Sequence, residues 1–202
     1  MLRSAIRDVL SPILRSAGVW RWKLSGRPAP PPHSAKQKVV KEFQKRFKLT
    51  TFVETGTYLG DMVNVAKGRF SRVYSIELSS ELAANAQRRF ATDKNVTILA
   101  GDSSELLPSI LAEINTPCLF WLDGHFSGGN TARGNSDYPI LGELTHIAGH
   151  SISGHVILID DARLFTGEES VPSRAQIYTA LTIINRLYVI KTEDDIIRAY
   201  LP

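Results

Sequence analysis

The chain has 202 residues, of which 43% are hydrophobic, 22% charged and 8% aromatic, with a single cysteine, Cys118. This composition indicates one globular domain with an extension, and it excludes collagenous and disordered chains as well as disulfide frameworks and sites with several thiolates. The net charge of +4 is unevenly divided, because residues 1–48 hold 12 Lys and Arg against 2 acids, whereas residues 49–202 hold 12 against 18. A basic quarter (+10) therefore precedes a mildly acidic remainder (−6), which is not typical of a nucleic-acid-binding surface.

The N-terminal segment is basic and amphipathic. Its apolar residues are interrupted by Arg3, Arg7, Arg15 and Arg21, so no apolar run is long enough for a membrane span or a secretory signal. We expect either a peripheral contact of residues 1–25 with a membrane or an anionic partner, or a helix or tail packed on the domain. The proline-rich run 26–32 predicts a boundary between an extension (1–32) and a domain (33–202). The expected location is cytoplasmic, with any membrane contact at the inner face.

Helical and strand-like segments alternate along the rest of the chain. Helical periodicity and caps predict helices over 36–47, after Gly60 through Lys67, from Ser80, after Asp102, from Pro139 and around 177–184. Runs rich in β-branched and apolar residues predict strands over 51–54, 72–78, 95–100, 118–122, 156–159, 187–191 and 196–201. This alternation indicates an α/β fold with a mostly parallel sheet and helices on both faces, and the last two strands must be antiparallel because only a few residues join them.

Acidic residues follow the predicted strands, where ligands of open α/β sheets bind. They are Glu54, Glu77, Asp102, Asp123, Asp160 and Asp161. The first turn reads Glu54-Thr55-Gly56-Thr57-Tyr58-Leu59-Gly60, and Glu77 lies 21 residues beyond Gly56, the spacing of a ribose-binding carboxylate. The turn is neither a dinucleotide fingerprint nor a P-loop. An acid directly before it favours a cationic ligand over a pyrophosphate.

These residues resemble the motifs of the class I S-adenosylmethionine-dependent methyltransferases over roughly residues 52–161. The resemblance implies a three-layer Rossmann-like fold with a seven-stranded sheet that ends in an antiparallel pair, and S-adenosylmethionine as cofactor. It also implies that Glu77 binds the ribose, that Asp102 and Ser103 lie beside the adenine, and that Asp123 lies near the methyl group. Tyr58 stands where the motif has its middle glycine. The implied donor-binding residues are Glu54, Thr55, Gly56, Thr57, Tyr58, Gly60, Glu77, Leu78, Asp102, Ser103 and Asp123.

Three carboxylates, those of Asp123, Asp160 and Asp161, are expected to converge if the fourth and fifth strands are neighbours. Like charges at one place favour a bound cation, and oxygen ligands suit Mg²⁺ or Mn²⁺. The pattern resembles the metal-dependent O-methyltransferases of the macrolide-sugar type, which implies that Mg²⁺ binds the acceptor's vicinal oxygens. In the alternative reading, Asp123 contacts the methyl donor or a backbone amide, Asp160 caps a loop and Asp161 is solvated.

The candidate catalytic residues are Asp123, at the end of the fourth strand, and His125. The imidazole of His125 suits a general base or a neighbour of the metal. The glycine-rich loop that follows, through Tyr138, is long enough to be an acceptor lid. Arg133 and Arg163 are either anion or sugar contacts or ordinary surface arginines.

We therefore expect S-adenosylmethionine-dependent methylation of an oxygen on a small molecule or a glycan, with Mg²⁺ as a candidate second cofactor. One alternative is a non-catalytic binding or scaffold protein with the same fold. A less favoured alternative is a nucleic-acid methyltransferase, because the Asn/Asp-Pro-Pro-Tyr/Phe type of motif does not follow the fourth strand.

Overall fold

The computed structural model describes residues 18–124 and 138–202, and within them seven strands form one sheet in the order β3-β2-β1-β4-β5-β7-β6. The strands are β1 (Thr51–Thr55), β2 (Arg72–Glu77), β3 (Val96–Ala100), β4 (Leu119–Leu122), β5 (Val156–Ile159), β6 (Val189–Glu193) and β7 (Ile196–Tyr200). Strands β1 to β5 are parallel, and β7 is antiparallel to both β5 and β6. The predicted fold class, including the antiparallel pair, is confirmed.

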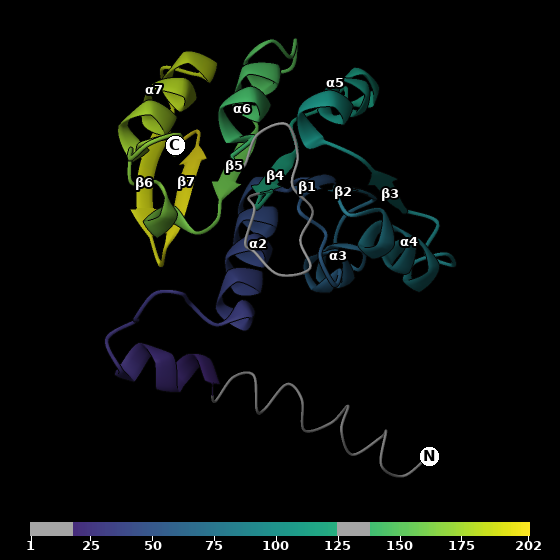
Figure 1. The fold of residues 1–202 in the computed structure, drawn as a ribbon, viewed down its shortest axis with the longest axis horizontal. Coiled ribbons are helices and arrows are strands. Elements are labelled where there is room, and N and C mark those ends of the chain that lie inside the picture. The colour runs from purple at the N-terminus through teal and green to yellow at the C-terminus, as the bar shows by residue number, and fades with distance from the viewer. Residues whose placement is uncertain (1–17, 125–137) are drawn as a thin grey trace.

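Helices cover both faces of the sheet, so the fold has three layers (Figure 1). The helices α2 (His33–Phe47), α3 (Asp61–Ala66) and α4 (Ser80–Arg89) pack on one face. The helices α5 (Ser103–Glu113), α6 (Ile140–Ala148) and α7 (Arg174–Ile184) pack on the other. A short 3₁₀ helix, η1 (Ala162–Leu164), follows β5.

The central strands are buried on both sides. In β4, Leu119 and Trp121 pack toward the layer of α2, α3 and α4, whereas Phe120 and Leu122 pack toward the layer of α5, α6 and α7. Strands covered on both faces have near-continuous apolar sequences, and each fully buried large side chain contributes about 1.5 to 3 kcal/mol of hydrophobic free energy. The two cores therefore hold the carboxyl ends of β1, β4 and β5 side by side.

The C-terminal hairpin differs slightly from the prediction. Strand β6 begins at Val189 rather than at residue 187, because the Asn185 side chain accepts a hydrogen bond from the Leu187 N–H (2.9 Å) and closes a turn there. The tight connection to β7 consists of Asp194 and Asp195, both with positive φ, of 54° and 61°. Asp tolerates this left-handed conformation in tight turns, and the two carboxylates form ion pairs with Arg27 and Arg163, respectively.

Part of the N-terminal extension lies within the described residues. Residues 18–24 are helical, and the Trp22 indole donates a hydrogen bond to the Pro28 carbonyl (2.8 Å). Residues 1–17, which carry most of the predicted amphipathic segment, lie outside the described residues, and the boundary near residue 32 stays a prediction. In the two described ranges, 18–124 and 138–202, no helix has both the length and the apolar character needed to cross a membrane.

Candidate active site

The turn after β1 lies against the end of β4 and requires its first glycine. Gly56 has a φ of +85°, and a Cβ there would lie 2.5 Å from the Asp123 carbonyl oxygen. Gly60 has a φ of +76°, and a Cβ there would lie 2.7 Å from the Phe90 ring. The predicted glycines are thus needed for backbone conformation and close approach. Gly56 brings the ends of β1 and β4 together, whereas Gly60 lets the turn approach the Phe90 ring.

Glu77, at the end of β2, is tied to the same turn. Its carboxylate accepts hydrogen bonds from the Tyr58 N–H (2.7 Å) and the Ser79 N–H (2.9 Å). Tyr58, in place of the motif's middle glycine, has a φ of +48°, and its side chain is exposed. The Tyr58 amide therefore points toward Glu77 while the ring points into solvent. The partly buried Leu78 follows Glu77 directly.

Glu54 is buried beneath the turn rather than exposed on it. Its carboxyl accepts a hydrogen bond from the Ser75 hydroxyl (2.5 Å), which is also hydrogen bonded to the buried Thr57 hydroxyl (2.6 Å). Burial raises the pKa of Glu54 to about 8, with a further increase from Glu77, although the Ser75 hydrogen bond opposes the shift. At neutral pH this carboxyl therefore holds a proton, which a nearby cation would displace.

A second buried acid, Glu143, was not among the residues expected from the sequence. It lies in α6 and accepts a hydrogen bond from the Ser103 hydroxyl (2.6 Å). Burial raises the pKa of Glu143 to about 7, opposed by the hydroxyls of Ser103 and Thr55. Asp102, the residue before Ser103, caps α5 by accepting from the Ser104 N–H (2.9 Å). The available sequence signal for Glu143 was a charged residue on the apolar face of α6.

The ends of β4 and β5 bring Asp123, Asp160 and Asp161 together, as expected for neighbouring strands. Leu122 pairs with Ile159 in the register of the two strands, which places Asp123 beside Asp160. Burial and the charge of Asp160 raise the pKa of Asp123. Burial also raises the pKa of Asp160, to about 6, although the ammonium group of Lys36 opposes this shift.

Lys36, in the first part of α2, supplies the cation at this cluster. Its Nζ lies 2.5 Å from Asp160 Oδ2 and 3.1 Å from Asp161 Oδ1. Arg163 adds a second ion pair to Asp161 (2.8 Å). Although burial acts to raise the pKa of Asp161, hydrogen bonds from Arg163 and Lys36 lower it overall. Sequence reasoning did not find Lys36, which lies 124 residues from Asp160 in the chain.

The donor set as arranged does not fit a divalent metal ion. Among the described residues, no group of three or more His, Cys, Asp or Glu is placed to hold one, and the ammonium group of Lys36 already lies between two of the three predicted ligands. Metal binding by Asp123, Asp160 and Asp161 stays a prediction, and the position of Lys36 argues against it.

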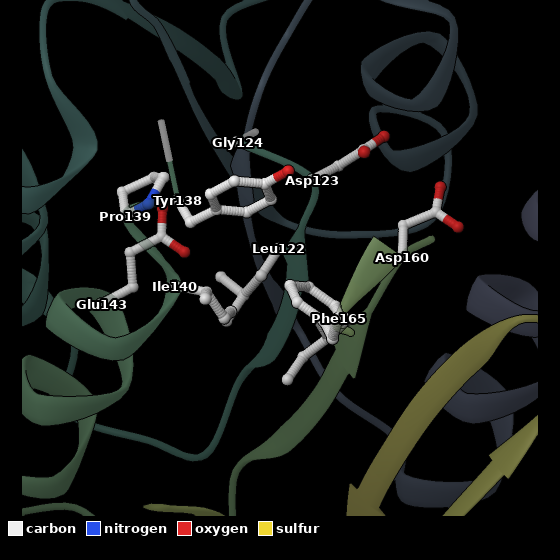
Figure 2. A pocket seen from close by; sticks show the side chains of 10 residues that line it. Leu122, Asp123, Gly124, Tyr138, Pro139, Ile140, Glu143, Asp160 and Phe165 are labelled. Atoms are coloured by element: carbon white, nitrogen blue, oxygen red, sulfur yellow. The ribbon is translucent and has the colours of Figure 1, made fainter. Parts of the chain in front are cut away.

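A hollow opens next to this cluster, at the ends of β4 and β5 (Figure 2). It has about 250 Å³ of empty space, part of which is open to solvent. In this view the ring of Tyr138 lies between the carboxyl of Glu143 on one side and those of Asp123 and Asp160 on the other. Its lining residues are Leu122, Asp123, Gly124, Tyr138, Pro139, Ile140, Glu143, Ile159, Asp160 and Phe165. The predicted base His125, Arg133 and the loop through residue 137 lie outside the described residues.

Solved structures share this fold over nearly the whole chain. An O-methyltransferase from Bacillus cereus, in complex with S-adenosylhomocysteine, has a TM-score of 0.62 and 15% identity, with 100% of both chains covered. An O-methyltransferase from Streptomyces achromogenes involved in tomaymycin synthesis, in complex with S-adenosylmethionine, has a TM-score of 0.58 and 14% identity, with 98% of this chain and 96% of that chain covered. A Podospora anserina methyltransferase bound to S-adenosylhomocysteine has a TM-score of 0.55 and 13% identity, with coverages of 93% and 88%.

Neither a protein-family model nor a curated protein sequence matches the chain. At these identities the similarity concerns the fold, and the α/β methyltransferase fold is the one that this chain adopts.

Proposed function

We propose that this protein is an S-adenosylmethionine-dependent methyltransferase that methylates an oxygen of a small molecule or a glycan. One observation carries the proposal: the left-handed Gly56 lies so close to the Asp123 carbonyl that no Cβ fits, which joins the ends of β1 and β4, while Glu77 joins β2 to the same turn. This close approach would strain the backbone of any residue but glycine, and a ligand site at the switch point of the sheet accounts for it.

The donor-binding residues are proposed to act together at these strand ends. Glu77 has an acceptor carboxylate for the ribose hydroxyls, and Asp102 with Ser103 lies at the end of β3 for the adenine. Glu54 is proposed to compensate the positive charge of the donor, because a nearby cation would lower the pKa of its buried carboxyl and favour the ionised form. Thr55, Thr57, Tyr58, Gly60 and Leu78 form the surrounding turn and strand ends.

The cofactor, when bound, supplies an electrophilic methyl group on a sulfonium. The chain's part is to hold the acceptor oxygen in line with that methyl group and to receive the hydroxyl proton. Asp123 lines the hollow, and burial raises the pKa of its carboxyl, which makes its ionised form a stronger base. His125 follows two residues later in the sequence and stays the second candidate base. The hollow has apolar and aromatic walls, including Phe165, and several carboxyl groups beside them. Such a lining favours a neutral acceptor that carries hydroxyl groups.

Donor binding is tested by calorimetry with S-adenosylmethionine and S-adenosylhomocysteine on the full chain. We expect Glu77→Gln to weaken binding about 10- to 100-fold, because hydrogen bonds to a charged group contribute about 1.5 to 3 kcal/mol. Glu81→Gln is the matched control, since Glu81 is exposed on α4. No heat with either ligand would overturn the proposal. Donor binding without methyl transfer to any hydroxyl-bearing acceptor would favour the non-catalytic binding protein instead.

A further inference from the structure

The Lys36 ammonium group takes the position at which the sequence predicts a divalent cation. We propose that Lys36 is a built-in cation that positions Asp160 and Asp161 and replaces a divalent metal at the ends of β4 and β5. The side chain of Lys36 is 13% exposed, that of Asp160 is fully buried and that of Asp161 is 13% exposed. The consequence for catalysis rests on the proposed function, whereas the consequence for metal binding does not.

The position of Lys36 follows from the packing of α2. The helix begins at His33, and its buried residues Ala35, Val39 and Val40 hold it against the sheet. Residues 39 and 40 are three and four positions beyond Lys36, so Lys36 shares their side of the helix. A charge on the buried side of a helix is costly unless it has partners. Two carboxylates are its partners here.

At least three of the four carboxylate oxygens of Asp160 and Asp161 already accept hydrogen bonds. The Asp160 carboxylate accepts from Lys36 at Oδ2 and from the Asp161 N–H at Oδ1 (2.8 Å). Asp161 Oδ1 accepts from both Lys36 and Arg163. A divalent ion needs several oxygen ligands at about 2.0 to 2.6 Å, so it would have to displace these donors. It would also meet the repulsion of two cationic side chains.

The neighbouring lysine of the same helix shows that this arrangement is specific. Lys38 forms an ion pair with Glu42 at 3.6 Å, and both side chains are 57% exposed. Such surface pairs contribute about 0 to 1 kcal/mol. Lys38 is therefore the control for a change of charge in α2 that does not reach the cluster.

A fixed ammonium group also bears on which acceptors fit. A bound divalent metal can chelate two vicinal oxygens of an acceptor at once, whereas the ammonium group of Lys36 already donates hydrogen bonds to Asp160 and Asp161. With Lys36 in place of a metal, chelation does not hold the acceptor, so the acceptor does not require a vicinal diol. This consequence holds only if the protein is a methyltransferase.

The test is a titration with Mn²⁺ as probe, followed by electron paramagnetic resonance, on the full-length wild type and on Lys36→Met, Lys36→Arg and Lys38→Met. Wild type, Lys36→Arg and Lys38→Met are expected to bind Mn²⁺ with a Kd of about 1 mM or weaker. Lys36→Met frees the carboxylates, and we expect it to bind one Mn²⁺ at least about tenfold more tightly. The added substitution Asp160→Asn should abolish this gain.

Three results would overturn the inference, two for the wild type and Lys36→Met and a third for Lys36→Arg. One is a wild type that binds one Mn²⁺ tightly and loses it in Asp160→Asn. Another is a folded Lys36→Met variant, with the circular dichroism of the wild type, that gains no affinity for Mn²⁺. If Lys36→Met does not fold, the wild type and Lys36→Arg still decide, since tight binding of Mn²⁺ by either contradicts a built-in cation. The donor calorimetry is a separate measurement, so a failure of the proposed function is distinguishable from a failure of this inference.

Discussion

The carboxyl groups at the carboxyl edge of the sheet have different hydrogen-bonding partners in its two halves. The first half comprises the ends of β1 to β3, and the second half comprises the ends of β4 and β5. At the ends of β1 to β3, Glu54 binds a hydroxyl group and Glu77 binds backbone N–H groups, with partners at most 21 residues away. At the ends of β4 and β5, Asp160 and Asp161 bind cationic side chains, one of which is 124 or 125 residues away. In the first half, the carboxyl groups therefore accept hydrogen bonds from uncharged donors that are near in the sequence. The second half depends on a charge that only tertiary packing delivers.

The largest effect is expected when the ion pairs of the second half are removed. Lys36→Met leaves the charges of the buried pair without their main cation, and removal of one partner from a buried ion pair costs about 3 to 5 kcal/mol. We expect the free energy of unfolding, measured by urea denaturation, to fall by this order, and Lys36→Met/Asp160→Asn to recover part of the loss. Added Mn²⁺ should raise the midpoint of thermal unfolding of Lys36→Met but not that of the wild type. A loss below about 1 kcal/mol would mean that the pair behaves as a surface ion pair.

The next largest effect is expected when the close contact of Gly56 with Asp123, which joins the two halves, is disturbed. Gly56→Ala places a Cβ 2.5 Å from the Asp123 carbonyl oxygen at a φ of +85°. Backbone strain and overpacking together are expected to cost about 2 to 4 kcal/mol. Gly68→Ala is the matched control, because no atom lies within 4 Å of its added Cβ. Urea denaturation compares the two variants, and equal stabilities would contradict the close approach.

The third effect depends on pH and concerns the first half. The pKa of Glu54 is raised to about 8, so the folded state keeps a proton that the unfolded state loses above about pH 4. The stability that this group contributes is therefore fully present below about pH 4. It is lost progressively as the pH rises toward 8, by about 1 kcal/mol per pH unit. Relative to the wild type, Glu54→Gln should become steadily more stable between pH 5 and pH 8 in urea denaturation. A difference that does not change with pH would contradict the raised pKa.

The smallest effect concerns the turn that departs from the family motif. Tyr58 has a φ of +48° and a side chain that is 56% exposed. Tyr58→Gly removes the cost of the left-handed conformation, about 1 kcal/mol, but adds entropy to the unfolded chain. We expect a change in the free energy of unfolding within about 1 kcal/mol, with Tyr58→Ala less stable than Tyr58→Gly. The reverse order in thermal unfolding would indicate that the backbone at this residue is not strained.

The sequence was sufficient for the order of the elements and for the acids at the strand ends. Apolar runs such as 118–122 and the helical periodicity of the crossovers are local patterns, and the right-handed connection rule turns them into a parallel sheet. The prediction that Asp123 and Asp160 meet required the fourth and fifth strands to be neighbours, and the pairing of β4 with β5 confirms that they are. The start of β6 was missed by two residues, because a turn stabilised by the Asn185 side chain delays it.

By itself, then, the sequence determined the fold class, the glycine turn and the acids that gather at one edge of the sheet, because each depends on a pattern within one or two elements. Only the tertiary structure decided what faces those acids. Glu143 reaches Ser103 because α6 packs beside α5, and Lys36 reaches Asp160 because α2 packs under the ends of β4 and β5. A lysine in an amphipathic helix has the same local pattern whether it is solvated or buried, and the difference arises only when distant elements are packed together.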